Sequence, residues 1–194
     1  MIFSTVGFGC KKAEQPTEAP KSAEQPKAPV PVEGFKVING TLEKGGLGVI
    51  LTSEKDKAAV AMKKLDIPFK NIMKVKGQMK SALPSGVRNG FIAFTGYFSD
   101  KKAQGARAGI LIGGKKFTID GAFVEKIEKP HNFDQGKIFD FELTINLKAK
   151  NVSMKIDGET VTTKMTKAPL LISNIGFLAA NTKTEFSDLQ ISGN

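Results

Sequence analysis

The stretch Phe139-Asp-Phe-Glu-Leu-Thr-Ile-Asn-Leu147 alternates apolar and polar residues without interruption. Every odd-numbered position is Phe, Leu or Ile, and every even-numbered position is polar. Successive side chains of a β-strand point to opposite faces, so this period of two predicts a strand with one buried face and one exposed face. The carboxylates Asp140 and Glu142 then share the exposed face, where we expect them to partner nearby lysines.

The same period continues on both sides of this stretch. After it, Val152–Val161 alternates around Asp157-Gly158, a dipeptide typical of a tight hairpin turn. Before it, shorter runs predict strands at 72–79, 91–94, 108–112 and 117–119. Ala58–Lys64 is the best candidate for a helix, although it runs into Pro68. Residues 35–194 are therefore predicted to form an all-β domain of two packed antiparallel sheets, a β-sandwich or jelly roll.

The end of the chain resembles a known family. Ile175-Gly-Phe177 and Thr184-Glu-Phe-Ser-Asp-Leu-Gln-Ile191 resemble the closing strands of concanavalin A-like lectin/glucanase domains, including laminin G-like modules. Lys155-Ile-Asp-Gly-Glu159 resembles the hairpin that precedes them. The resemblance covers roughly residues 35–194 and implies a concanavalin A-like fold with carbohydrate as the partner. Lectins of this family bind calcium through loop Asp and Asn residues, so calcium is the one cofactor it leaves open, with these candidates: Asp100, Asn132, Asp134 and Asn181.

The N-terminus differs in composition from the rest. Residues 1–9 are largely apolar or small, and they precede the only cysteine, Cys10. Residues 11–34 are rich in Lys, Glu, Ala and Pro and repeat Ala-Glu-Gln-Pro, so they bury too little apolar surface to fold and are predicted to be a disordered linker. Gly9-Cys10 ahead of such a linker resembles a bacterial lipoprotein processing site. The resemblance implies a signal-like segment at residues 1–10, a lipid anchor at Cys10, and a location in the bacterial cell envelope, periplasmic or outer surface. The alternative is a free cysteine in a disordered tail.

The charge of the chain limits the classes of binding partner that we expect. The chain carries 29 basic and 19 acidic residues, a net charge of +10, and no Trp. Only Arg88 and Arg107 are arginines, and lysine is poorly suited to bidentate recognition. Readers of nucleic acid more often combine arginine clusters with aromatic residues, so we expect no nucleic-acid partner. A lysine-rich surface instead favours solubility, or weak attraction to an anionic envelope polymer or lipid headgroups.

Catalytic patterns are weak. The glucanases of the family that the chain resembles carry an E-x-D-x-x-E strand, and this spacing does not occur here. One His and one distant Cys cannot complete a zinc site. Gly109–Lys115 nearly spells a phosphate-binding loop, but apolar strand-like runs flank it, which favours a hairpin turn at Gly113-Gly114. We therefore expect a non-catalytic binding domain, with a divergent carbohydrate-active hydrolase or lyase as the alternative.

Candidate ligand contacts lie in two loops. Tyr97, the only tyrosine, precedes Asp100, Lys101 and Lys102 and offers an aromatic surface with polar neighbours. His131 and Asn132 lie in a turn-like stretch, where His131 is either an exposed loop residue or one half of a dyad with Asp134. The predicted ligand is a glycan or another component of the envelope, and no metal site is predicted from spacing.

Overall fold

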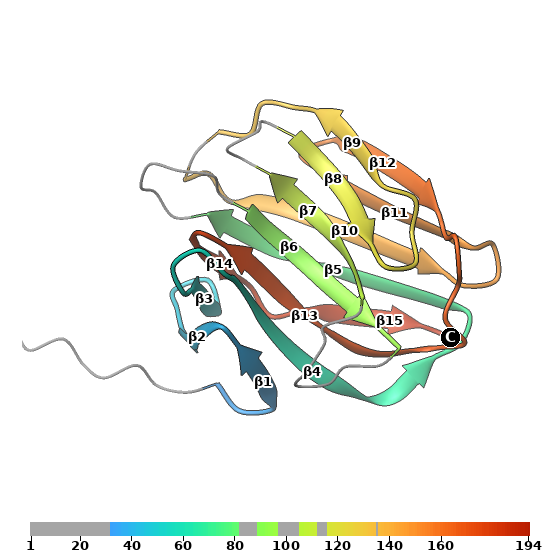
Figure 1. Ribbon diagram of the computed structural model, residues 1–194, viewed down its shortest axis with the longest axis horizontal. Helices are drawn as coiled ribbons and strands as arrows, with labels where there is room; N and C mark the ends of the chain where they lie inside the picture. Colours follow the sequence, from blue (N-terminus) through green and yellow to red (C-terminus); the bar gives the residue numbers. More distant parts are fainter. Residues whose placement is uncertain (1–31, 82–88, 97–104, 112–115, 135) are drawn as a thin grey trace, which may run out of the picture.

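The computed structural model describes residues 32–81, 89–96, 105–111, 116–134 and 136–194. This part of the chain holds fifteen strands in two sheets, and every pairing between strands is antiparallel. The sheets lie one over the other (Figure 1). The predicted all-β, two-sheet sandwich is confirmed.

One sheet has seven strands and the other eight. In spatial order, the seven-stranded sheet consists of β1 (Phe35–Ile38), β4 (Ala58–Phe69), β13 (Ile172–Ala180), β6 (Asn89–Thr95), β7 (Ala106–Leu111), β8 (Lys116–Gly121) and β9 (Ile127–Pro130). The eight-stranded sheet consists of β12 (Glu159–Lys164), β11 (Asn151–Ile156), β10 (Phe139–Asn146), β5 (Ile72–Ser81), β14 (Lys183–Phe186), β3 (Val49–Ser53) and β2 (Gly40–Lys44), with β15 (Gln190–Gly193) also paired to β5.

The alternating stretch that begins at Phe139 forms β10, at the centre of the eight-stranded sheet. Phe141 is 3% exposed and Ile145 is fully buried, whereas Glu142 between them reaches solvent. Strand β10 pairs with β5 on one side and with β11 on the other. Its apolar face therefore points between the sheets and its polar face points away from them, as the period of two predicts.

The hairpin predicted at Asp157-Gly158 joins β11 to β12. Both turn residues have positive φ, 52° at Asp157 and 79° at Gly158. Two consecutive residues in this region are the signature of a primed turn, which matches the natural twist of the strands it connects. Glycine adopts this conformation without steric cost, and aspartate is among the few other residues that tolerate it.

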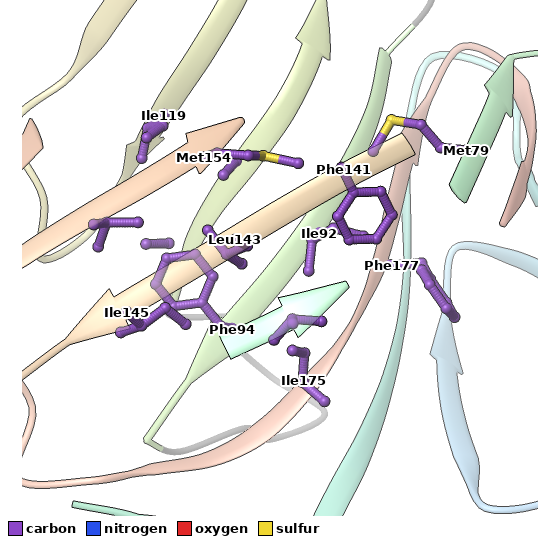
Figure 2. Close-up of a cluster of buried hydrophobic side chains, with 14 of the residues drawn as sticks. Met79, Ile92, Phe94, Ile119, Phe141, Leu143, Ile145, Met154, Ile175 and Phe177 are labelled. Atoms are coloured by element: carbon purple, nitrogen blue, oxygen red, sulfur yellow. The ribbon is translucent and has the colours of Figure 1, made fainter. Parts of the chain in front are cut away.

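The space between the sheets is filled by aliphatic, methionine and phenylalanine side chains (Figure 2). Phe177 of the seven-stranded sheet stacks on Phe186 of the eight-stranded sheet, with 4.4 Å between ring centroids. Gly77 of β5 leaves room for the ring of Phe141, because a Cβ there would lie 2.9 Å from it. The predicted core positions of β10 are thus packed against both neighbouring strands and the opposite sheet.

The interpretation of Ala58–Lys64 as the best helix candidate is wrong, because this segment begins β4. Strand β4 lies inside the seven-stranded sheet, between β1 and β13. Ala59 and Ala61 join the main core, while Val60 and Met62 are buried in a second apolar cluster on the outer face. Burial on both faces removes the alternation that reveals a strand, and the remaining run of small apolar residues resembles a helix.

The predicted leader at residues 1–10, most of the linker at 11–34 and the turn at Gly113-Gly114 lie outside the described residues. The flanking strands β7 and β8 pair antiparallel up to Leu111 and Lys116, so the described chain resumes at Lys116 as a strand. The described residues contain no helix able to cross a membrane.

We expect Phe141→Ala to lower the free energy of unfolding by ~3–5 kcal/mol, because it leaves a cavity between two tightly packed sheets. Glu142→Ala, one residue further on the solvent face, should cost under about 1 kcal/mol, since it removes only an exposed ion pair. Urea titration of both variants checks the difference. Equal losses would contradict the register assigned to β10.

Candidate ligand-binding site

A hollow of about 920 Å³ lies on the outer face of the eight-stranded sheet. Its floor is formed by β10, β5 and β11, near the end where β10 begins. Its walls come from the turn at Asp157–Gly158, the residues just before β10, the loop at Leu47 and the connection between β14 and β15. Segments distant in sequence therefore meet around one concave surface.

A row of polar side chains crosses this floor. The strand pairings place five residues side by side, from β12 to β15: Thr160, Lys155, Glu142, Lys76 and Gln190. Lys76 Nζ lies 3.1 Å from Glu142 Oε2, which confirms the expected lysine partner for that carboxylate. Neighbouring strands are ~4.8 Å apart, so the row offers donors and acceptors at regular intervals across the sheet.

Further polar groups continue this pattern on the floor and beyond it. Asp140 Oδ1 accepts a hydrogen bond of 2.8 Å from Gln78 Nε2, so its partner is an amide rather than the lysine expected. On the opposite side of the row, a second line consists of Thr162, Ser153, Thr144, Lys74 and Ser192. Within it, Thr162 Oγ1 and Ser153 Oγ lie 3.1 Å apart. The exposed face is thus a lattice of hydroxyl, amide, ammonium and carboxylate groups.

His131 lies beside the rim of the hollow. Its Nε2 is 3.5 Å from Asp157 Oδ2, its side chain is 20% exposed, and its ring packs edge-on against Phe133. Lys137 also approaches Asp157, at 3.6 Å. Both interpretations of His131 as an exposed residue or as a partner of Asp134 are therefore wrong, because the carboxylate that faces it belongs to the β11–β12 turn.

The other predicted contacts are less informative. Asn132 is exposed in the connection before β10, next to His131. Tyr97, Asp100, Lys101 and Lys102 lie outside the described residues, so their role stays a prediction. Asp134 and Asn181, named for calcium, lie in two separate connections, and no cluster of three or more His, Cys, Asp or Glu side chains suited to a metal ion occurs in the described ranges.

Two residues of the floor, Gln78 and Gln190, were not singled out from the sequence, whereas Lys76 and Lys155 belong to the lysine-rich surface that the sequence predicts. Lys76, Gln78, Lys155 and Gln190 come from three strands whose order in the sheet is not evident along the chain. Each sits at a polar position of an alternating strand, and this is the only signal that could have found them. Apolar contact is available at the rim from Ile138, which is 46% exposed.

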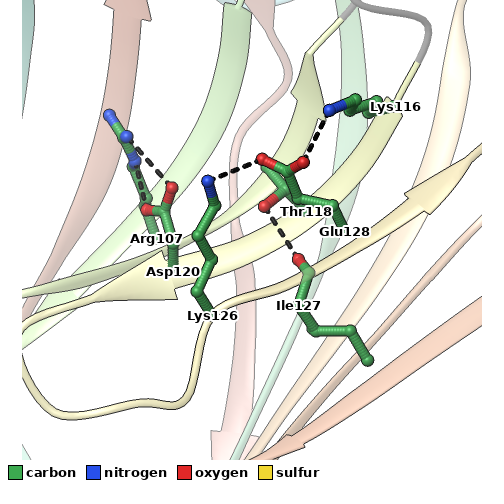
Figure 3. Close-up of polar contacts among 7 residues, drawn as sticks. All are labelled: Arg107, Lys116, Thr118, Asp120, Lys126, Ile127 and Glu128. Atoms are coloured by element: carbon green, nitrogen blue, oxygen red, sulfur yellow. Dashed lines mark hydrogen bonds and ion pairs between the residues drawn. The ribbon is translucent and has the colours of Figure 1, made fainter.

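The outer face of the seven-stranded sheet differs from this surface. An apolar groove of about 210 Å³ runs beside Val60, Met62 and Leu178, with Arg107 at its border. The Arg107 guanidinium makes two hydrogen bonds to Asp120, of 2.5 and 3.1 Å (Figure 3). It also lies 4.8 Å from the centre of the Phe91 ring. Since Arg107 is already paired and stacked, this smaller groove offers mainly apolar contact.

Glu128 lies on the same outer face, between two lysines (Figure 3). Its carboxylate is 2.7 Å from Lys116 Nζ and 2.8 Å from Lys126 Nζ. Hydrogen bonds from Lys116 and then Lys126 lower the pKa of Glu128 to about 2, because they stabilise its charged form. Near the hollow, the hydrogen bond from Lys129 likewise lowers the pKa of Glu159.

Comparison with solved structures identifies the fold. A carbohydrate-binding module of family 66 from Bacillus subtilis matches 82% of this chain and 96% of its own, with a TM-score of 0.64 and 14% identity. Arcelin-5, a lectin-like defence protein from Phaseolus vulgaris, matches 83% and 92%, with a TM-score of 0.59 and 13% identity. The fold is a lectin-type β-sandwich.

A sialidase matches 83% of this chain with a TM-score of 0.63 and 14% identity, but the chain spans only 17% of that protein. No protein-family model and no curated protein matches the sequence. The expected resemblance to concanavalin A-like domains is therefore confirmed for the fold, and at these identities for the fold alone.

We expect the Glu128 carboxyl to titrate near pH 2, far below the usual 4.5, in an NMR titration of side-chain carboxyl shifts. Because its pKa is lowered on folding, its contribution to stability is present above pH 4.5 and is lost as the pH falls through about 2. Lys116→Gln should move the midpoint up towards the usual value. An unchanged midpoint in that variant would mean that the lysine does not hold the carboxylate.

Proposed function

We propose that this protein is a carbohydrate-binding, non-catalytic domain of a membrane-anchored envelope lipoprotein. The glycan lies in the hollow on the outer face of the eight-stranded sheet, across β11, β10 and β5. The observation that carries this proposal is the row from Thr160 to Gln190, in which donors and acceptors alternate and four of the five residues line the hollow.

Such a row suits a ligand that carries many hydroxyl groups. A sugar hydroxyl can both donate and accept hydrogen bonds, so it can accept one from Lys76 or Gln190 and donate one to Glu142. The charge along the row alternates, because Glu142 lies between Lys76 and Lys155. A field of alternating sign favours a hydroxyl-rich ligand over a uniform polyanion. The fold shared with a carbohydrate-binding module and a lectin-like protein supports the same assignment.

We expect the full chain, kept soluble by Cys10→Ser, to bind one or more glycans on an array, and isothermal titration to give the affinity of the best. The double variant Lys76→Gln/Glu142→Gln should weaken that affinity about tenfold or more, since hydrogen bonds to charged groups are removed. Glu128→Gln, on the other sheet, is the control and should leave it unchanged. Full affinity in the double variant would place the ligand elsewhere. A repeat with a chelator tests whether calcium takes part.

A hydrolase or lyase is the second candidate, because Asp140 and Glu142 both lie on the floor of the hollow. Alternate residues on one strand have Cα atoms ~6.8 Å apart, close to the ~6.5–9.5 Å between carboxyl groups in inverting glycosidases. Release of new sugar ends from a bound polysaccharide, abolished by Asp140→Asn, would favour the enzyme. Binding without turnover favours the non-catalytic domain.

The anchor is proposed on the sequence alone. Cys10 follows an apolar segment and precedes a Pro-rich linker, and the first strand begins at Phe35. A lipid on Cys10 would hold the sandwich close to a membrane while the linker gives it reach.

In bacterial cells that process lipoproteins, we expect the wild-type chain in the membrane fraction and Cys10→Ser in the soluble fraction. Globomycin, which blocks lipoprotein signal cleavage, should produce a heavier precursor of the wild type only. A Cys10→Ser variant that still partitions with membranes and is not extracted by salt would refute the anchor.

A further inference from the structure

The two most exposed aliphatic side chains among the described residues are Leu170, 94% exposed, and Ile67, 79% exposed. Ile67 lies in a bulge of β4: Lys64 pairs with Asn174 and Phe69 with Ile172, so four residues of β4 face Ser173 alone. Leu170 precedes Ile172 by two residues. Both side chains therefore lie at the end of the sandwich where β4 ends and β13 begins, on the right of Figure 1.

Lysines surround these two side chains at the same end. The turn between β4 and β5 contains Lys70, and the backbone N–H of Leu147 donates to Asn71 in that turn, which brings the β10–β11 turn alongside. Met165 donates to the carbonyl of Lys150, which brings in the loop before β13. We call the resulting surface the basic end, with these lysines: Lys64, Lys70, Lys148, Lys150, Lys164 and Lys167.

The lysines of the basic end exceed the acidic side chains that the structure describes around them. Within the described part of the chain, none of its lysines forms an ion pair. Its described acidic side chains are Asp66 and Glu125, so six lysines face two side-chain carboxylates. The β3–β4 turn at the opposite end, residues 54–57, is balanced, with two of each sign.

We propose that the basic end docks on an anionic lipid bilayer. Leu170 and Ile67 enter the interface between headgroups and acyl chains, while the ammonium groups of the surrounding lysines remain among the lipid phosphates. Single exposed aliphatic residues are ordinary on protein surfaces. Here the two most exposed ones lie among lysines that form no ion pair with the described residues. This combination suits a bilayer, whose interior is apolar and whose headgroups carry negative charge.

The first described strand also starts beside the lysines of the basic end. Strand β1 begins at Phe35, which pairs with Lys63, the residue next to Lys64 of the basic end. The docking proposal does not require the anchor. Where the proposed anchor at Cys10 is present, the tether and the docking surface face the same membrane.

The hollow lies towards the opposite end of the same sheet. Its residues Phe139–Glu142 begin β10, whereas the lysines of the β10–β11 turn follow the end of that strand. A docked sandwich would therefore hold its basic end on the lipid and present the candidate glycan site away from it.

The test uses the full chain with Cys10→Ser, so that any binding comes from the protein surface. Co-sedimentation should give binding to vesicles of phosphatidylglycerol and phosphatidylcholine, and none to phosphatidylcholine alone. Lys70→Glu/Lys148→Glu should weaken binding by at least about 25-fold, at roughly fivefold for each lysine. Leu170→Ser should weaken it about tenfold through lost apolar contact, without affecting the fold, because that side chain is already exposed.

Lys55→Glu/Lys57→Glu is the matched control, since it makes the same charge change at the other end of β4. The first and last residues of β4 pair with Ala180 and Ile172, eight residues apart in β13, so the two ends of β4 lie ~27 Å apart, well beyond the ~8–10 Å over which charge acts in salt. This control should bind within about threefold of the parent. Bilayer docking would be overturned if both double variants lost vesicle binding equally, or if the parent showed no preference for anionic vesicles. It would also be overturned if Leu170→Ser bound vesicles as well as the parent and soluble heparin displaced the protein from them completely. If Lys76→Gln/Glu142→Gln loses glycan binding but still binds vesicles, the glycan site and the docking surface are distinct.

Discussion

Eight consecutive residue pairs join β10 to β5, from Phe139–Met79 to Asn146–Ile72. This register fixes which side chains enter the core and which form the outer face, because the side-chain period of a strand is two. A slip of one residue would send Glu142 into the core and Phe141 into solvent. The packed interior and the polar floor of the hollow are therefore two consequences of one pairing.

The two sheets use their outer faces differently. The eight-stranded sheet carries polar side chains outside, so its central strands alternate clearly between apolar and polar residues. The seven-stranded sheet buries a second cluster outside, formed by Val60, Met62, Phe91, Ala93 and Leu178. Its polar outer groups are gathered near β7, β8 and β9, where Arg107–Asp120 and the lysines around Glu128 pair with one another (Figure 3). The polar lining of the hollow is thus a feature of the eight-stranded sheet.

The net positive charge is also localised by the topology. Turns between β4 and β5 and between β10 and β11, together with the loop before β13, bring lysines from distant parts of the chain to one end. Charged groups on the sheet faces are more often matched, as with Lys76 and Glu142. The hollow proposed for glycan and the basic end proposed for lipid thus lie towards opposite ends of one sandwich.

Local sequence was sufficient to predict the fold class and the strands that have one buried face and one exposed face. Phe139–Leu147 and the Asp157-Gly158 turn were predicted correctly because alternation and turn chemistry depend only on neighbouring residues. Ala58–Lys64 was misread because burial on both faces depends on a strand's place within its sheet. The partners of His131 and Asp140 were likewise beyond the sequence, since Asp157 and Gln78 reach them only after strands and turns are brought together. The sequence alone thus determined the alternating strands and their apolar faces, whereas strand order, and with it the hollow and the basic end, was decided by tertiary packing, because contacts between distant segments form only when the two sheets close on a common core.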